Sequence, residues 1–266
     1  MSNQFLYGGN ILANGIRQHY LRYGGKGRAV ILIPGITSPA ITWGFVAERL
    51  SLHHDVYIVD VRGRGLSSTG PGLDYGLDAM ADDAIAFAQS LQLKNPAILG
   101  HSMGARIAMR AAIRSEGVFG RLALIDPPVS GPGRRPYPSQ LPWYVDSIRL
   151  AEKGMDAEAM KAFCPSWTDE QLQLRAEWLH TCYEPAIVKA FNDFHDIDIL
   201  PDFARLRVPA MLMVAGRGGV IQAADEEEIR ELNPSIQISR VAEAGHMIPW
   251  DHFDGFFEAL GDFLLP

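Results

Sequence analysis

A serine lies between two glycines, at the point where a short apolar segment meets a helix-forming one. Ser102 is the centre of Gly-His-Ser-Met-Gly at 100–104, which matches the pattern G-x-S-x-G. The apolar residues 96–99 predict a buried strand, and residues 105–113 are good helix formers. In this strand–turn–helix setting the serine hydroxyl is pushed outward and the glycines avoid collisions with neighbouring backbone. We therefore predict that Ser102 is a nucleophile, although the pentapeptide alone also fits an ordinary tight turn.

A serine hydroxyl needs a base that takes its proton, and His246 is the histidine best placed for that task. Residues 236–241 predict a strand, and His246 follows it in a loop before a closing helix predicted at 253–264. The other histidines fit structural positions in a hairpin, before a strand, in helices or beside the serine: His19, His53, His54, His101, His180, His195 and His252.

The base in turn needs a carboxylate that orients it. The common position, in the loop after the strand predicted at 210–214, carries no carboxylate. Asp126 ends the strand predicted at 122–125, beside the nucleophile strand in the expected sheet. Asp225 is the alternative, but it lies in an acidic helix start, where carboxylates complement the helix dipole. We predict Asp126 as the acid, which gives the order nucleophile, acid, base along the chain.

Backbone N–H groups must bind the negative charge that develops on the attacked oxygen. A strand predicted at 29–33 runs into a loop that begins Pro34-Gly35 and should meet the serine turn at the carboxyl edge of the sheet. We therefore expect the N–H groups of Ile36 and Met103 to form an oxyanion hole. The alternative is that Pro34-Gly35 makes only a turn.

The elements that must position these residues alternate between strands and helices. After a hairpin that turns at 13–15, strands are expected near 29–33, 55–60, 97–100, 122–125, 210–214 and 236–241, and helices near 41–50, 78–91, 105–114, 225–231 and 253–264. This alternation predicts an α/β fold, with a mostly parallel twisted sheet that is flanked by helices on both faces.

One long stretch interrupts the alternation, because residues 129–203 show helical patterns and no convincing strand. Helices inserted between two parallel strands predict a lid over the site. The expected organisation is a core formed by 1–128 and 204–266, with the helical lid insertion at 129–203. Trp143 and Tyr144, near the start of the insertion, are predicted to line the substrate pocket.

Composition narrows the class of protein. The 266 residues carry a formal net charge of −7, which argues against a nucleic-acid surface and against a polybasic membrane anchor. Residues 1–10 lack the features of a secretory signal, and no apolar run approaches the roughly 20 residues that cross a bilayer. Cys164 and Cys182 are too few for a disulfide framework and lack metal-site spacing. We expect a cytoplasmic enzyme that needs no metal or organic cofactor; the sequence leaves the oligomeric state open.

Together these residues resemble the α/β-hydrolase family over almost the whole chain. The matching segments are 14–20, 34–40, 126–135 and 244–250. The resemblance implies a triad of Ser102, Asp126 and His246. The longer segments are similar to family members that hydrolyse a formyl amide and release formate during nicotinate degradation. A carboxylesterase, a related enamide hydrolase, a C–C-bond hydrolase and a non-catalytic ligand-binding relative remain the alternatives.

The implied substrate is a small anionic amide, whereas the protein is net negative. A local cation is therefore expected in the site. We predict Arg217, because glycines on both sides free its loop, although a solvated or structural arginine fits the sequence equally well. Arg134, Arg135 and Arg149 of the inserted segment are the alternatives.

Overall fold

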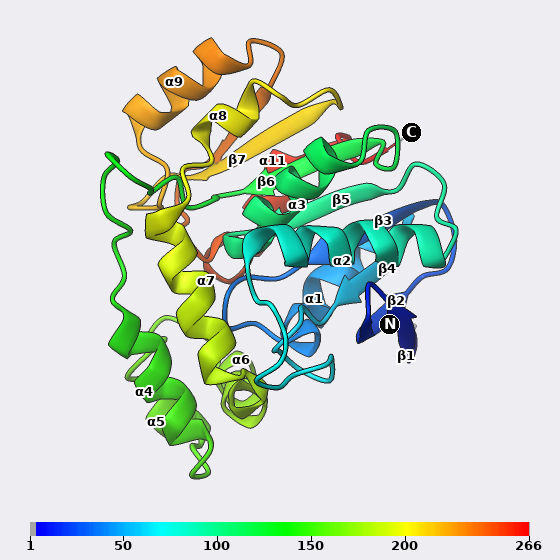
Figure 1. Ribbon diagram of the computed structural model, residues 1–266. Coiled ribbons are helices and arrows are strands. Elements are labelled where there is room, and N and C mark those ends of the chain that lie inside the picture. The colour runs from blue at the N-terminus through cyan, green and yellow to red at the C-terminus, as the bar shows by residue number, and fades with distance from the viewer. Residues whose placement is uncertain (1–3, 266) are drawn as a thin grey trace.

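The computed structural model of the protein describes residues 4–265, whose strands form one eight-stranded sheet (Figure 1). Residues 1–3 and residue 266 lie outside the described part. Residues 1–3 belong to the segment 1–10, in which the sequence predicts no secretory signal. The strand order is β1-β2-β4-β3-β5-β6-β7-β8. The bounds are β1 (Phe5–Ala13), β2 (Ile16–Tyr23), β3 (Arg28–Ile33), β4 (His54–Val59), β5 (Ala97–His101), β6 (Arg121–Ile125), β7 (Ala210–Ala215) and β8 (Gln237–Val241).

The sheet is parallel except at one edge. β1 and β2 form an antiparallel hairpin, and β2 pairs antiparallel with β4. Both hairpin turn residues, Asn14 and Gly15, have positive φ angles of 49° and 74°, which suits the twist of the flanking strands. From β4 to β8 every neighbouring pair is parallel. The predicted α/β fold with a mostly parallel sheet is confirmed.

Helices cover both faces of this sheet. One layer holds α2 (Leu77–Ser90), α3 (Met103–Arg114) and α9 (Ala223–Leu232), and the opposite layer holds α1 (Gly44–Leu50) and α11 (Phe253–Leu260). Successive strand residues such as Ile98 and Leu99 are fully buried on opposite faces. Because both faces are covered, the central strands are continuous apolar runs, as is typical of parallel sheets.

The chain between β6 and β7 forms only helices and loops. These helices are α4 (Leu141–Ala151), α5 (Ala157–Met160), α6 (Asp169–Trp178), the 3₁₀ helix η2 (Leu179–Thr181), α7 (Glu184–Asp196) and α8 (Leu200–Phe203). Figure 1 shows α4 to α7 as a group that lies beside the sheet rather than within its flanking layers. Arg106 of α3 holds this group to the core, because its guanidinium donates to the carbonyls of Asp193 and Ile197 at 2.8 and 2.6 Å.

The end of the chain departs from the expected single helix at 253–264. The structure has a short helix, α10 (Ile248–Asp251), followed by α11, which ends at Leu260. His252 separates them, because its extended backbone leaves the first helix and its ring accepts a hydrogen bond from Gly255 N at 2.8 Å. Gly261, with a φ of +49°, ends α11 early. Among the helices of residues 4–265, none combines the length and apolar character required to span a membrane.

Candidate active site

Ser102 occupies a sharp turn between β5 and α3. Its φ and ψ angles are +55° and −119°, a strained conformation for a residue with a side chain. The two glycines of the motif permit the turn. A Cβ at Gly100 would lie 2.1 Å from the carbonyl oxygen of Gly104, and a Cβ at Gly104 would lie 2.0 Å from that of Ile33. The turn therefore requires glycine at both positions, and it presents the hydroxyl of Ser102 at the carboxyl edge of the sheet.

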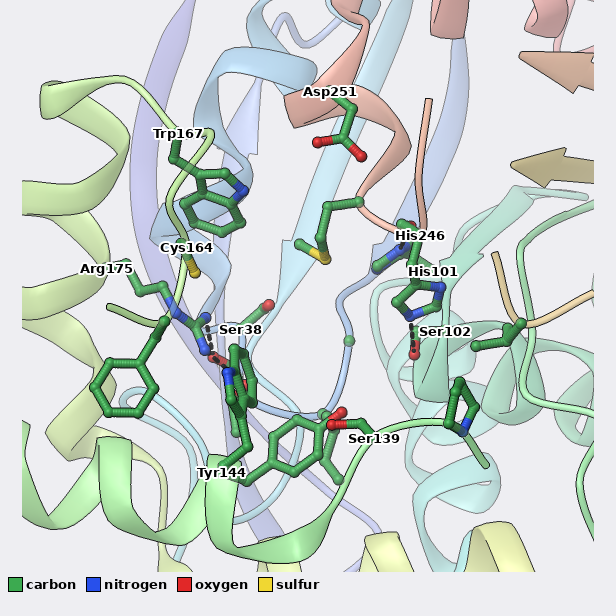
Figure 2. A pocket seen from close by; sticks show the side chains of 18 of the residues that line it. Ser38, His101, Ser102, Ser139, Tyr144, Cys164, Trp167, Arg175, His246 and Asp251 are labelled. Atoms are coloured by element: carbon green, nitrogen blue, oxygen red, sulfur yellow. Dashed lines mark hydrogen bonds between the residues drawn. The ribbon is translucent and has the colours of Figure 1, made fainter. Parts of the chain in front are cut away.

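The structure brings Ser102, His246 and Asp126 into one hydrogen-bonded line. His246 Nε2 lies 3.0 Å from Ser102 Oγ (Figure 2). His246 Nδ1 lies 2.7 Å from Asp126 Oδ2. A carboxylate accepts only, so Nδ1 carries the proton in this arrangement. Nε2 is then free to accept the hydroxyl proton of Ser102, which is the geometry of a serine nucleophile with its base.

Asp126 is held in place at the end of β6. Its side chain is fully buried, and Oδ2 also accepts a hydrogen bond from Val220 N at 3.0 Å. Burial acts to raise the pKa of this carboxyl, but the hydrogen bond and charge of His246 outweigh it and hold the pKa below its usual value. Gly219 packs directly on the carboxylate, because a Cβ there would lie 2.7 Å from Oδ2. The site therefore favours an ionised Asp126.

Asp225, the alternative acid, has a different environment. Its carboxylate accepts a hydrogen bond from Gln222 N at 2.8 Å, at the start of α9, and pairs with Arg135 at 2.6 Å. Its role in the structure is that of a helix cap, as the acidic helix start suggested.

A second histidine supports the loop that carries His246. The ring of His101 lies 4.9 Å from that of His246, and its Nε2 donates to the carbonyl oxygen of His246 at 2.9 Å. Burial, followed by the nearby positive charge that His246 can carry, lowers the pKa of His101 to about 3. His101 is therefore neutral at ordinary pH and adds no repulsion when His246 takes up a proton.

The two backbone N–H groups expected to form the oxyanion hole are available. Neither Ile36 N nor Met103 N donates to any acceptor within residues 4–265. Met103 is the first residue of α3, where the helix leaves its N–H unpaired. The carbonyl oxygen of Ile36 accepts a hydrogen bond from Arg64 Nε at 3.0 Å, which fixes this peptide.

These groups open into a cavity of about 490 Å³, a size typical of small-molecule sites. Its walls come from the serine turn, the loop after β3, the loops after β7 and β8, and the helical insertion. Trp143 and Tyr144 both line it, where the sequence predicted them. The Tyr144 hydroxyl lies 3.0 Å from that of Tyr137, which the sequence reasoning did not single out.

The structure places Arg217 away from this cavity. Its side chain is 63% exposed, is paired with the carboxylate of Glu243 at 3.7 Å, and donates to the carbonyl of the same residue. The neighbouring Gly218 lines the cavity, but Arg217 does not. The structure therefore contradicts the prediction of Arg217 as the cation of the site, because its guanidinium is exposed and engaged by Glu243 outside the cavity.

The alternative arginines are engaged elsewhere as well. Arg134 pairs with Asp198 and Glu228, Arg135 with Asp225, and Arg149 with Glu184. None of the three lines the cavity.

Arg175 is the cationic residue of the cavity, and the sequence reasoning missed it. It is 4% exposed and lines the cavity from α6. The sequence carries no clear signal for it, because the apolar residues of α6 are not gathered on one face of the helix. In the structure Leu172, Ala176 and Leu179 are buried, and Arg175 lies at the i+3 position from Leu172, on the same side of the helix.

One carboxylate also lines the cavity. Asp251 of α10 accepts a hydrogen bond from Gly245 N at 2.9 Å. Burial raises the pKa of this carboxyl above its usual value. Figure 2 shows Asp251 and Arg175 on different walls of the cavity, so the acidic and the basic side chain of the lining lie apart. Within the described residues no group of three or more His, Cys, Asp or Glu side chains is arranged to hold a metal ion.

Comparisons with known proteins agree with this geometry. The profile of the Alpha/beta hydrolase family matches residues 30–259. N-formylmaleamate deformylase from Pseudomonas putida is 67% identical over 260 residues, which cover 98% of this chain and 97% of the relative.

Comparison with solved structures identifies similar hydrolases. The crystal structure of an N-formylmaleamic acid deformylase from another strain of Pseudomonas putida, a serine-to-alanine variant, has a TM-score of 0.93 at 57% identity. The match covers 96% of this chain and 100% of that chain. E-2-(acetamidomethylene)succinate hydrolase matches with a TM-score of 0.79 at 21% identity, over 98% of this chain and 99% of that chain. At that identity the likeness is one of fold.

Proposed function

The chain belongs to the alpha/beta hydrolase family, and from this premise we propose that it is a serine hydrolase that cleaves the formyl C–N bond of N-formylmaleamate. The products are maleamate and formate, and the reaction belongs to nicotinate degradation, as the sequence resemblance implies. The hydrogen-bonded line from Asp126 through His246 to Ser102, at the wall of the cavity, carries the proposal of a serine hydrolase. The 67% identity to a deformylase over 98% of the chain supports the choice of substrate.

The first half of the reaction forms a formyl-enzyme. His246 Nε2 takes the proton of Ser102 Oγ as this oxygen attacks the formyl carbon. The carbonyl oxygen becomes an oxyanion, which the N–H groups of Ile36 and Met103 bind. One such donor contributes about 2.7–4 kcal/mol to stabilisation of the transition state. Asp126 holds the imidazole in the correct tautomer and stabilises its positive charge.

Collapse of this intermediate breaks the C–N bond. His246 gives its proton to the departing nitrogen, and maleamate leaves as a neutral amide at that end. The leaving nitrogen is less basic than an amine, because it is conjugated with the second carbonyl group of maleamate. Water then attacks the formyl-enzyme while His246 takes one of its protons. Formate leaves as the proton returns to Ser102 Oγ, which restores the enzyme.

The helical insertion at 129–203 serves in this proposal as the lid that encloses the substrate. Trp143, Tyr144 and Trp167 contribute aromatic surface to the cavity. Enclosure removes water from the site, and electrostatic interactions such as those of the oxyanion hole become stronger as a result.

The test is turnover of N-formylmaleamate by the purified protein, with formate and maleamate both quantified. We expect the two products in equal amounts. We also expect Ser102→Ala to lower kcat at least about 10⁴-fold, because the residual rate of a triad enzyme without its nucleophile is small. Short acyl esters, an enamide and a C–C-bond substrate are assayed in parallel.

The outcomes separate the classes of function. Cleavage of an ester, an enamide or a C–C bond without formate release from N-formylmaleamate would assign the protein to that other class. Unchanged activity in Ser102→Ala would remove the serine mechanism. Binding of the substrate without any turnover by the wild-type protein would identify a non-catalytic relative.

A further inference from the structure

Arg175 is a buried cation that has no anionic partner. No Asp or Glu oxygen within residues 4–265 lies within ion-pair distance of its guanidinium, although the side chain is only 4% exposed. Its two hydrogen bonds to oxygen both go to Thr37, from Nη1 to the carbonyl at 3.2 Å and from Nη2 to Oγ1 at 3.1 Å. Its Nε is buried without a partner. A guanidinium offers five N–H donors, so this one keeps unused capacity.

Two other buried arginines have their donors engaged by protein acceptors, which sets Arg175 apart. Arg64 and Arg106 are also buried and lack a carboxylate partner. Arg64 donates to the carbonyls of Ile36, Arg62 and Ala186 and to the sulfur of Met103. Arg106 donates to the carbonyls of Pro128, Ser130, Asp193 and Ile197. Neither lines the cavity at Ser102, whereas Arg175 does.

Two aromatic rings hold the guanidinium of Arg175 in place. Its central carbon lies 5.7 Å from the ring centre of Trp143 and 5.6 Å from that of Trp167. Trp167 in turn stacks on Trp250 of α10 at 5.2 Å. Such contacts stabilise a cation and exclude water from its faces, while the edge of the planar group stays able to bind an anion. The guanidinium of Arg175 is therefore preorganised to bind an anion.

This cation and the serine face the same cavity from opposite walls, as Figure 2 shows for Arg175 and Ser102. N-formylmaleamate has a formyl amide at one end and a carboxylate at the other. When the formyl carbon lies at Ser102, the carboxylate must therefore lie in another part of the cavity. Arg175 is the one arginine or lysine among the described lining residues, and Asp251, on another wall, disfavours an anion near itself.

From these contacts we infer that Arg175 binds the carboxylate of the substrate and thereby selects anionic formyl amides over neutral ones. The inference rests on the proposed function for the identity of the substrate. The protein carries a net charge of −7, so a small anion gains little from its overall field, and a local cation must supply the attraction. Since Thr37 follows Ile36 directly, the carboxylate site is also joined to the proposed oxyanion loop.

The test compares two substrates that share the cis double bond and the formyl amide and differ at the other end. N-formylmaleamate carries the carboxylate, and (Z)-N-formylbut-2-enamide has an uncharged methyl group in its place. In Arg175→Met we expect kcat/KM for the anionic substrate to fall about 100-fold or more, in the range found when a buried charged partner is truncated. We expect kcat/KM for the neutral substrate to stay within about threefold, so that the preference for the anion is lost.

Two further variants serve as controls. Arg149→Met removes the same charge from an exposed arginine of the insertion that is paired with Glu184, and it should keep the wild-type preference. Should Arg175→Met fold poorly, Arg175→Gln carries the same comparison, because its shorter side chain removes the charge and keeps a polar N–H donor in the cavity wall. An equal loss for both substrates, or an unchanged rate with the anion, would overturn the inference and leave Arg175 as a structural tether between α6 and Thr37.

A binding measurement separates this inference from the proposed function. Maleate is titrated into wild-type protein and into Arg175→Met by calorimetry. If the wild type releases no formate but binds maleate, and Arg175→Met does not bind it, the proposed substrate is wrong and the anion site stands. If the wild type is an active deformylase and both proteins bind maleate equally, the deformylase stands and the anion site is wrong.

Discussion

His101 should make the stability of this protein depend on pH in a way that one substitution removes. The ring is 1% exposed and is neutral in the folded protein, because burial lowers its pKa to about 3. In the unfolded chain a histidine has a pKa of about 6.5. Below that pH the unfolded chain binds a proton at this position and the folded protein does not. The free energy of unfolding must therefore decrease as the pH falls from about 6.5 towards 3.

The magnitude follows from the difference in pKa. Each pH unit below 6.5 costs about 1.36 kcal/mol, so a change from pH 7.5 to pH 5 removes about 2 kcal/mol of stability through this residue. His101→Gln removes the titrating ring, and its amide can still donate to the carbonyl of His246. We expect the free energy of unfolding of the variant to change about 2 kcal/mol less than that of the wild type over this interval.

The assay is urea unfolding at pH 7.5, 6.5, 5.8 and 5, with the slope m compared at each pH to verify a two-state transition. His180→Gln is the matched control, because that ring lies exposed at the surface and the variant should keep the pH dependence of the wild type. His246 and Asp126 are the titratable groups that interact with His101, and both are present in all three proteins. An identical pH dependence in wild type and His101→Gln would refute the view that this ring is held neutral by burial.

Two further predictions concern the acid of the site. Asp126→Asn should lower kcat for formate release by about 10⁴-fold, because the amide stabilises the wrong tautomer of His246. Asp225→Asn should keep kcat within about threefold of the wild type. Steady-state kinetics of both variants measures the ranking, and a reversed ranking would assign the acid to position 225. Gly219→Ala should lower kcat by at least about tenfold with a smaller effect on KM. The added Cβ would lie 2.7 Å from Asp126 Oδ2 and must displace the carboxylate. A wild-type kcat in a folded Gly219→Ala protein would contradict the tight packing around Asp126.

Much of the fold and the serine turn could be predicted from the sequence, because their causes are local. An alternation of apolar runs and helical periods determines which segments are strands, and burial on both faces follows from the absence of polar residues within them. The turn at Ser102 needs glycine at 100, since a Cβ there would collide with the carbonyl oxygen of Gly104 in the same turn, whereas glycine at 104 is required by the close approach of the Ile33 carbonyl oxygen at the end of β3. The closing helix starts at 253 as predicted but was predicted too long at its end, because the left-handed backbone of Gly261 does not alter the apolar pattern.

The cation of the site was decided by tertiary structure alone. Arg217 and Arg175 each stand without another arginine beside them in the sequence. The glycines that flank Arg217 made it the preferred candidate for the cation of the site. The direction of the Arg217 side chain depends on the path of its loop. Contacts of this loop with residues near Glu243 determine that path. Arg175 gains its role from Trp143, Trp167 and Thr37, which lie on three separate segments. A motif encodes the local backbone, whereas the surroundings of a long side chain are assembled from distant parts of the chain, so only the folded protein distinguishes a solvated arginine from a buried one.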